Sequence, residues 1–254
     1  MDLSLDDYEK LQFQAKINHG GAEMRFSTPN NFTFWRVQSI YEKEPWTLEW
    51  IASIAPGEIL LDCGANVGMY TVWAAVTRSA RVYAFEPESQ NYAILNQNIL
   101  LNDISGLVTA YCMALSDTTG LSTLHMADLR AGASCHAVGE ALDFRLQPME
   151  PVFAQGCVAS TLDDLVRGGA MPVPHHMKID VDGLEPRVIA GARETLANPV
   201  LRSLLIETNQ NLATHMAMVA ELHAAGFRHD EAQVARAERK DGAFLGVAEY
   251  VFRR

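Results

Sequence analysis

Residues 60–75 read LLDCGANVGMYTVWAA, and this stretch decides the fold. An apolar run ends at Asp62, passes through Gly64 and Gly68, and enters a second apolar run. The pattern is typical of a buried strand, a tight turn and a helix. Gly64 can adopt the positive φ that a tight turn needs, and Gly68 leaves room for the helix to pack against the strand. The stretch therefore predicts the first strand–turn–helix unit of a ligand-binding α/β sheet.

The turn matches neither of the common phosphate-binding loops. A dinucleotide-binding loop has glycine at the middle position of G-x-G-x-x-G, where this chain has Asn66. A Walker A loop has lysine and then serine or threonine after its last glycine, where this chain has Met69 and Tyr70. The Asn66 amide and the Asp62 carboxylate suit a zwitterionic ligand better than a diphosphate. An NAD-dependent oxidoreductase is therefore a disfavoured alternative.

Apolar strands alternate with helical patterns along most of the chain. The alternation predicts one doubly wound α/β domain of about seven strands, which are parallel where helices separate them. The expected strands cover residues 58–64, 81–87, 106–116, 117–126, 156–161, 175–181, 202–208 and 245–254. The expected helices start near Pro45 and cover residues 68–79, 89–102, 160–166, 185–197 and 213–227.

Three segments depart from this alternation. Residues 1–44 predict a loosely ordered N-terminal arm or cap, so we expect the main domain to span residues 45–254. Residues 117–160 contain two short strands around an irregular stretch, and they predict an insertion near the acceptor site because long irregular segments in compact domains are usually functional. The charged residues 235–242, ARAERKDG, predict a solvated hairpin or loop.

The composition narrows the class of partner. The 254 residues are 48% hydrophobic, which is enough for a sizeable core. The net charge of −11 repels a phosphate backbone and an anionic membrane surface. The acidic N-terminus lacks the apolar core of a signal peptide, and no window is apolar enough to span a membrane. The four cysteines are scattered along the sequence, so they predict neither a zinc site nor disulfides. We therefore expect a soluble cytoplasmic protein that does not bind nucleic acid, and the sequence leaves the oligomeric state open.

An acidic residue, Glu86, ends the second expected strand and is followed by Pro87. In nucleoside-binding sheets an acid at this position commonly accepts hydrogen bonds from ribose hydroxyls. Together with the first turn, Glu86 predicts a nucleoside-containing cofactor. A non-catalytic nucleoside-binding or partner domain remains an alternative.

Six short motifs occur in the order found in one known family. They are D-x-G-A-N-x-G at residues 62–68, AFEP at 84–87, ALSD at 114–117, KIDVDG at 178–183, VIAGA at 188–192 and IET at 206–208. Together they span roughly residues 44–210 and resemble the FkbM family of S-adenosylmethionine-dependent methyltransferases. The resemblance implies a class I methyltransferase fold, with a mostly parallel seven-stranded sheet whose last strand is antiparallel. It also implies O-methylation of a hydroxyl group on a saccharide or polyketide-like natural product.

The same resemblance implies where the S-adenosylmethionine cofactor binds. Its amino-acid end would lie against the first turn, its ribose against Glu86, and its adenine near the end of the third strand. The cofactor-binding residues would be Asp62, Gly64, Ala65, Asn66, Gly68, Glu86, Pro87, Met113 and Ala114.

A sugar hydroxyl is a weak nucleophile, so we expect a general base. Asp180 follows the expected fourth strand and is the best-placed acid, with Lys178, Asp182 and Glu207 beside it. Strand alternation puts Lys178, Asp180 and Asp182 on one face if the strand extends that far. A structural ion pair of Lys178 with Asp180 or Asp182 remains open, as does helix capping by Asp180. Asp182 also departs from the family, which more often has glutamate there.

A metal-dependent mechanism is a second alternative. Asp180, Glu207 and Asn209 offer hard oxygen ligands to Mg²⁺, as in catechol-type O-methyltransferases. The FkbM pattern does not require a metal, so we expect none. The histidines lack the spacing of a metal site. We expect His136 on the surface, with a role as base only if the insertion folds over the cleft.

Overall fold

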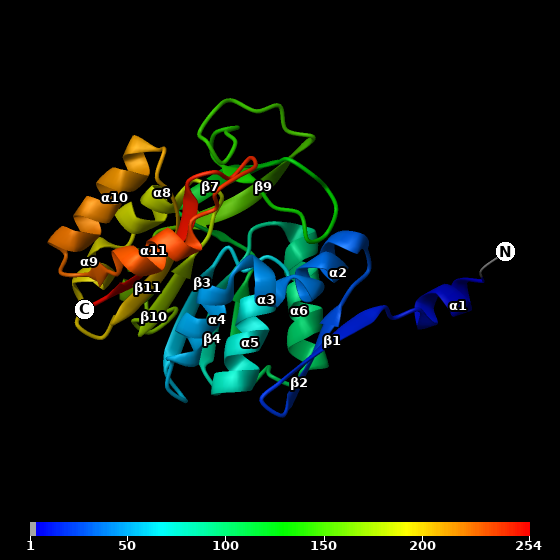
Figure 1. Ribbon diagram of the computed structural model, residues 1–254. Coiled ribbons are helices and arrows are strands. Elements are labelled where there is room, and N and C mark those ends of the chain that lie inside the picture. Colours follow the sequence, from blue (N-terminus) through cyan, green and yellow to red (C-terminus); the bar gives the residue numbers. More distant parts are fainter. Residues whose placement is uncertain (1–3) are drawn as a thin grey trace.

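The computed structural model describes residues 4–254, and its largest feature is a seven-stranded sheet (Figure 1). The strand order is β12-β13-β11-β10-β3-β4-β5. Neighbours from β11 to β5 pair in parallel, whereas β13 is antiparallel to both β11 and β12. The order and directions confirm the predicted class I methyltransferase fold, including its antiparallel last strand.

The central strands are buried because helices cover both faces of the sheet. All residues of β3 and β10 are buried, and successive side chains alternate between two hydrophobic clusters, with Leu60 in one and Leu61 in the other. The strands of this sheet are β3 (Ile59–Cys63), β4 (Arg81–Phe85), β5 (Val108–Tyr111), β10 (His176–Ile179), β11 (Ser203–Asn209), β12 (Arg228–His229) and β13 (Val247–Arg253).

The covering helices fall largely where they were expected. Beyond the N-terminal segment, the helices with residues in the Leu60 cluster are α4 (Pro45–Ala52), α5 (Met69–Arg78) and α6 (Ser89–Leu101). Those with residues in the Leu61 cluster are α7 (Leu162–Arg167), α8 (Glu185–Ala190), α9 (Arg193–Ala197), α10 (Ala213–Ala224) and α11 (Glu231–Ala237). The single helix expected over residues 185–197 is wrong, because the chain breaks at Gly191, where a Cβ would lie 2.0 Å from the Ser116 carbonyl oxygen.

The insertion forms a sheet of its own above the main sheet (Figure 1). Its strand order is β6-β9-β7-β8. The strands expected at residues 117–126 and 156–161 pair with each other here, and the strand expected over 106–116 is divided between the two sheets. The edge strand β12 was not expected. The strands of this second sheet are β6 (Ala114–Leu115), β7 (Gly120–Met126), β8 (Ala137–Val138) and β9 (Phe153–Ser160).

The prediction of a loosely ordered N-terminal arm is wrong for residues 14–43. Met24 and Phe26 are fully buried in the main core, and the Ser27 amide donates to the Asn98 Oδ1 atom of α6 at 2.7 Å. Helix α1 projects from the body of the molecule (Figure 1). The elements of this segment are α1 (Leu5–Lys10), the hairpin of β1 (Gln14–His19) and β2 (Ala22–Ser27), α2 (Asn31–Gln38) and α3 (Ile40–Lys43).

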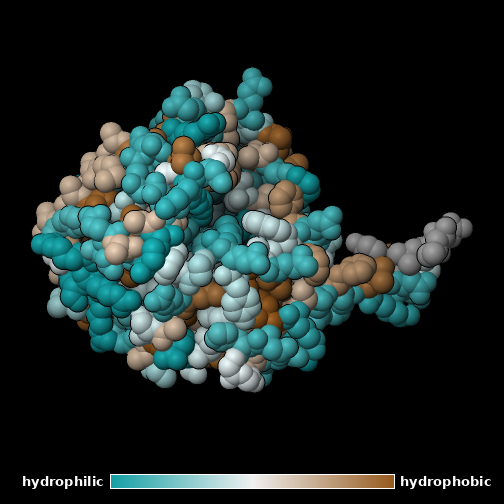
Figure 2. All heavy atoms as spheres, in the orientation of Figure 1, coloured by the Kyte–Doolittle hydropathy of each residue, from teal (hydrophilic) through white to brown (hydrophobic). Residues whose placement is uncertain are grey.

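The surface reflects the acidic composition. Most of the face in Figure 2 is hydrophilic, and hydrophobic side chains gather over α5 and the neighbouring hairpin. Across residues 4–254, no helix has both the length and the hydrophobicity to cross a bilayer. The cavity that contains most of the predicted site residues lies where the main sheet, the second sheet and α2–α3 meet.

Candidate active site

A cavity of about 400 Å³ opens at the carboxyl ends of the central strands. Its volume lies within the usual range for small-molecule and cofactor sites. Six of the nine residues expected to bind the cofactor line it, and so do three of the four expected catalytic residues. These nine are Gly64, Asn66, Glu86, Pro87, Met113, Ala114, Asp180, Asp182 and Glu207.

The turn after β3 has the tight geometry that its sequence predicts. Gly64 has φ +80°, and a Cβ there would lie 1.9 Å from the Asp180 carbonyl oxygen. The glycine therefore lets the ends of β3 and β10 approach each other. Gly68 has φ +82°, and a Cβ there would contact the Leu95 side chain of α6. Gly68 therefore makes room for α6, whereas the sequence predicted that it makes room for the following helix to pack against the strand. Ala65 is buried within the turn and lies off the main cavity.

Asn66 connects three parts of the site. Its backbone amide donates to Glu86 Oε2 at 2.7 Å, and its Nδ2 donates to the Ala133 carbonyl oxygen of the insertion, also at 2.7 Å. Its Oδ1 accepts from the amide of Val67. The Asn66 side chain therefore ties the insertion to the turn. Its amide nitrogen and oxygen both form hydrogen bonds within the protein.

Glu86 is held rigidly at the cavity wall. It is 5% exposed, and its Oε1 accepts from the Glu88 amide at 2.9 Å. Burial raises the pKa of Glu86 to about 7. Each carboxylate oxygen has a second lone-pair direction, so both oxygens can also accept from a diol.

Asp62 does not line the cavity. It is 1% exposed, its Oδ2 accepts from Thr71 Oγ1 at 2.6 Å, and its Oδ1 has no partner among the described residues 4–254. Burial raises its pKa, and Lys178 lies beside it in the register of β3 and β10. Asp62 is placed beneath the turn, out of reach of a ligand in the main cavity.

Lys178 is buried beneath Asp180. Its Nζ donates to Asp180 Oδ2 at 2.8 Å and lies 5.0 Å from the centre of the Tyr70 ring. This is the ion pair that the sequence left open. Burial lowers the pKa of Lys178, but the nearby carboxylates of Asp180 and Glu44 raise it by a larger amount. The net pKa lies above the usual value, so the ammonium stays charged. Lys178 is a positioning residue for Asp180.

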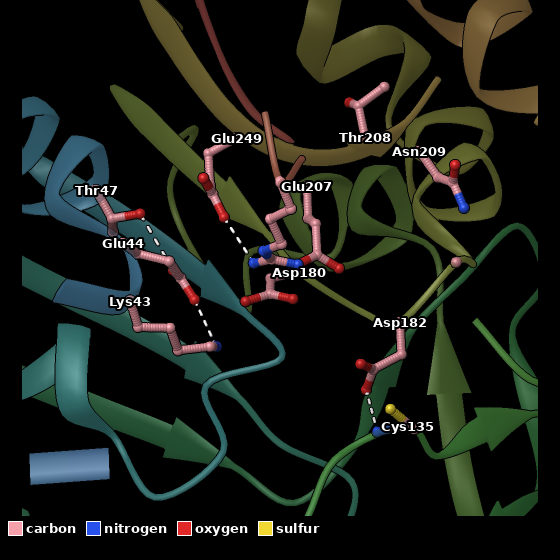
Figure 3. Close-up of polar contacts among 12 residues, drawn as sticks. Lys43, Glu44, Thr47, Cys135, Asp180, Asp182, Glu207, Thr208, Asn209 and Glu249 are labelled. Atoms are coloured by element: carbon pink, nitrogen blue, oxygen red, sulfur yellow. Dashed lines mark hydrogen bonds and ion pairs between the residues drawn. The ribbon is translucent and has the colours of Figure 1, made fainter. Parts of the chain in front are cut away.

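Asp182 lies outside the strand that was expected to present it. Strand β10 ends at Ile179, and Asp182 adopts φ +54°. The prediction that strand alternation puts Lys178, Asp180 and Asp182 on one face therefore does not hold, because the strand does not extend to Asp182. The Cys135 amide of the insertion donates to Asp182 Oδ2 at 2.7 Å (Figure 3). Burial, together with Asp180, raises the pKa of Asp182 to about 6. Asp182 thus faces the cavity and also anchors the insertion.

Glu207 shares an arginine with a second buried acid, Glu249 (Figure 3). Arg239 donates from Nη1 to Glu207 Oε1 at 2.9 Å and from Nη2 to Glu249 Oε1 at 2.8 Å. Burial and the charge of Asp180 raise the pKa of Glu207 to about 7. The prediction of a solvated hairpin or loop over residues 235–242 is therefore wrong at Arg239, which lines the cavity, and residues 235–237 belong to α11.

A model of the methyltransferase FkbM domain matches residues 62–229. This chain belongs to the FkbM methyltransferase family. The matched range includes the turn, Glu86 and the acids at the ends of β10 and β11. It excludes α2 and α3, as well as Arg239 and Phe244, which line the rest of the cavity.

Two relatives of this FkbM methyltransferase have names that state their activities. The hexuronic acid methyltransferase AglP of Haloferax volcanii is 23% identical over 176 residues, covering 69% of this chain and 67% of that protein. The 31-O-demethyl-FK506 methyltransferase FkbM of Streptomyces tacrolimicus is 26% identical over 196 residues, covering 68% and 74%. A solved FkbM methyltransferase from Methylobacillus flagellatus is 14% identical, with a TM-score of 0.49, over 89% of this chain and 55% of that one.

The Mg²⁺ set considered for this FkbM methyltransferase is not assembled. Asn209 is buried, its Oδ1 accepts from the Asn211 amide, and its side chain points away from Asp180 and Glu207 (Figure 3). Glu185 lies closer, with an oxygen within 4.8 Å of the other two acids. Its carboxylate already accepts from the backbone amides of Val181 and Gly183.

Several residues at this FkbM methyltransferase site were not expected from the sequence. Lys43 donates to the buried Glu44 at 2.6 Å, and Thr47 Oγ1 donates to the other Glu44 oxygen at 3.2 Å (Figure 3). His136 was expected on the surface but is half-buried in the cavity wall, and burial lowers its pKa. The others are Trp35, Arg36, Arg239 and Phe244. The sequence signals these residues only through the charged run before Pro45. An exposed helix start carries the same kind of charged run, so this signal does not identify a site.

Proposed function

We propose that this protein is an S-adenosylmethionine-dependent O-methyltransferase that acts on a hydroxyl group of a saccharide or polyketide-like molecule. One observation carries the proposal: a single cavity joins the Gly64 turn and Glu86 to the acids Asp180, Asp182 and Glu207. The activities that name the two relatives, on a hexuronic acid and on 31-O-demethyl-FK506, support this class of acceptor.

The residues present suit the cofactor. Glu86 offers two acceptor oxygens for a ribose diol, and Met113 and Ala114 line the wall expected at the adenine. Glu86 and Asp182 form no ion pair among the described residues, so two buried acids face the cavity without a cation. A sulfonium or ammonium group gains from such carboxylates in a partly dry site.

The bound cofactor would supply an electrophilic methyl group. The protein's part is to position the acceptor hydroxyl and to take its proton. Arg239 holds Glu207 through Oε1, which leaves Oε2 to accept the proton as the new C–O bond forms. Asp180, fixed by Lys178, lies beside Glu207 and orients the hydroxyl.

Equilibrium binding tests the cofactor first. We expect S-adenosylhomocysteine to bind in titration calorimetry and NAD not to bind. Binding of NAD alone would mean an oxidoreductase and would overturn the proposal. Absence of binding by both would favour the partner-domain alternative.

Methyl transfer tests the chemistry. Incubation with methyl-labelled S-adenosylmethionine and a panel of saccharides, uronic acids and macrolides is expected to label a hydroxyl oxygen, identified by mass spectrometry. Labelling is expected to survive EDTA, because Asn209 is engaged away from the acids and the Glu185 carboxylate already accepts from two backbone amides. Unchanged transfer by Asp180→Ala, Glu207→Ala and Lys178→Ala would show that the catalytic site lies elsewhere.

A further inference from the structure

A second, smaller cavity of about 40 Å³ adjoins the main one beside the Gly64 turn. Five residues line both cavities, so the smaller one continues the larger. They are Arg36, Lys43, Gly64, Asn66 and Asp180. This extension lies at the end of the site where the proposed cofactor would place its amino-acid group.

The charges around this extension are paired with one exception. Lys43 pairs with Glu44 at 2.6 Å, and Lys178 pairs with Asp180 at 2.8 Å. Arg36 is half-buried, and its Nε donates to the Gly132 carbonyl oxygen at 2.6 Å. No carboxylate within residues 4–254 forms an ion pair with Arg36, and no hydrogen bond engages its Nη1 or Nη2 there. Arg36 thus presents two guanidinium nitrogens without an anionic partner.

A half-buried guanidinium without a carboxylate is costly unless a ligand supplies one. Guanidinium binds carboxylate through two parallel hydrogen bonds, more strongly than neutral donors do. Asp180 also lines this extension, and its carboxylate can accept from an ammonium group. The extension therefore matches an α-amino carboxylate, with its negative end at α2 and its positive end at β10.

We propose that Arg36 binds the α-carboxylate of the cofactor. This inference rests on the proposed function, and it adds a cofactor-binding residue from α2, outside residues 62–229 that match the family domain. The N-terminal segment then completes the cofactor site, because its Arg36 provides the partner for the carboxylate. The bond from Nε to Gly132 fixes the side chain and joins α2 to the insertion over the same end of the cavity.

The test compares two ligands that differ only in the carboxylate. S-adenosylhomocysteine and its decarboxylated analogue, S-adenosyl-3-thiopropylamine, are titrated calorimetrically into the wild-type protein and into Arg36→Met and Arg36→Lys. We expect Arg36→Met to weaken S-adenosylhomocysteine binding at least tenfold and to leave the analogue within twofold. Arg36→Lys keeps the charge and should recover part of the lost affinity.

Asn30→Ala is the matched control for a purely structural role. Asn30 Nδ2 donates to the Ala131 carbonyl oxygen and its Oδ1 caps α2 through the Thr33 amide, so its loss loosens the same segment and the start of the same helix but keeps the Arg36 side chain. We expect this variant to affect both ligands equally. If Arg36→Met also affects both equally, or neither, the inference is wrong while the proposed function stands. If the wild-type protein does not bind S-adenosylhomocysteine, the proposed function itself fails.

Discussion

At the scale of single residues, the partner of each acid sets its role. Asp180 is neutralised by Lys178, Glu207 shares Arg239 with Glu249, and Glu86 accepts only from backbone amides. Glu207 combines a pKa of about 7 with a position on the cavity wall. A base with a pKa near the working pH is the most effective in proton transfer.

Glu207 is therefore expected to govern the pH profile of methyl transfer. The base acts only when deprotonated, so kcat/KM should fall as the pH drops below about 7. Glu207→Gln should lower kcat roughly 10²–10⁴-fold and remove this limb of the profile. The measurement is kcat/KM between pH 5.5 and 9. A variant that retained both the rate and the limb would exclude Glu207 as the base.

Gly64 is expected to be irreplaceable because of the Asp180 backbone. Gly57 has the same φ of +80°, but a Cβ there would meet no atom within 4 Å. Gly57→Ala should cost about 1 kcal/mol of unfolding free energy through backbone strain alone. Gly64→Ala should cost well over that, because it also forces β3 and β10 apart. Denaturant unfolding compares the two, and equal losses would show that the close approach is unimportant.

The sequence predicted the turn residues better than their partners. Gly64 and Glu86 directly follow strands with clear hydrophobic patterns, and the topology of a parallel sheet brings the strand ends together. Arg36 and Arg239 come from segments without such a pattern, and only the tertiary fold brings them to the cavity. Asp62 was misplaced because a strand-end acid can face either the ligand or the core, and the sequence does not distinguish the two.

At the scale of elements, the N-terminal hairpin belongs to the core. Its apolar positions, such as Met24 and Phe26, alternate over only a few residues, which is too short a pattern to predict a strand pair. The two-residue strand β12 and the break at Gly191 were missed for a related reason, since both depend on neighbours distant in the sequence. Long periodic elements such as α5 and α6 were predicted well.

The hairpin is expected to contribute to the stability of the whole domain. Phe26→Ala removes a fully buried ring and should lower the unfolding free energy by about 3–5 kcal/mol. Phe13 precedes the same hairpin and is 63% exposed, so Phe13→Ala should change it by less than about 0.5 kcal/mol. Thermal or denaturant unfolding measures both variants. A small loss for Phe26→Ala would favour the original prediction of a loosely ordered arm.

At the scale of the whole molecule, acids dominate the site. Burial raises the pKa of Glu86 and Glu207 to about 7 and that of Glu249 to about 8. An acid with a raised pKa in the folded chain stabilises that chain only while protonated. Its contribution is complete below the unfolded pKa of about 4.3 and is lost as the pH rises through the folded pKa.

The ligand-free protein should therefore lose stability as the pH rises from about 4.3 to about 8, the highest of these folded-state pKa values. Each acid can contribute at most about 1.4 kcal/mol per pH unit while it titrates. Differential scanning calorimetry is expected to show a falling Tm over this range, and Glu249→Gln should flatten the fall. A Tm that stayed level or rose would show that these acids remain ionised in the folded protein.

The pairing of β3 with β10 also bears on how the chain acquires its structure. Ile59 donates a hydrogen bond to His175, 116 residues further along, and the whole insertion lies between them. Closing so long a loop costs entropy before the contact stabilises anything, so the centre of the sheet should assemble late. During synthesis, one edge of β3 has no neighbour until β10 emerges. We expect the nascent chain to depend on chaperones over that interval, since an unpaired hydrophobic strand edge invites aggregation.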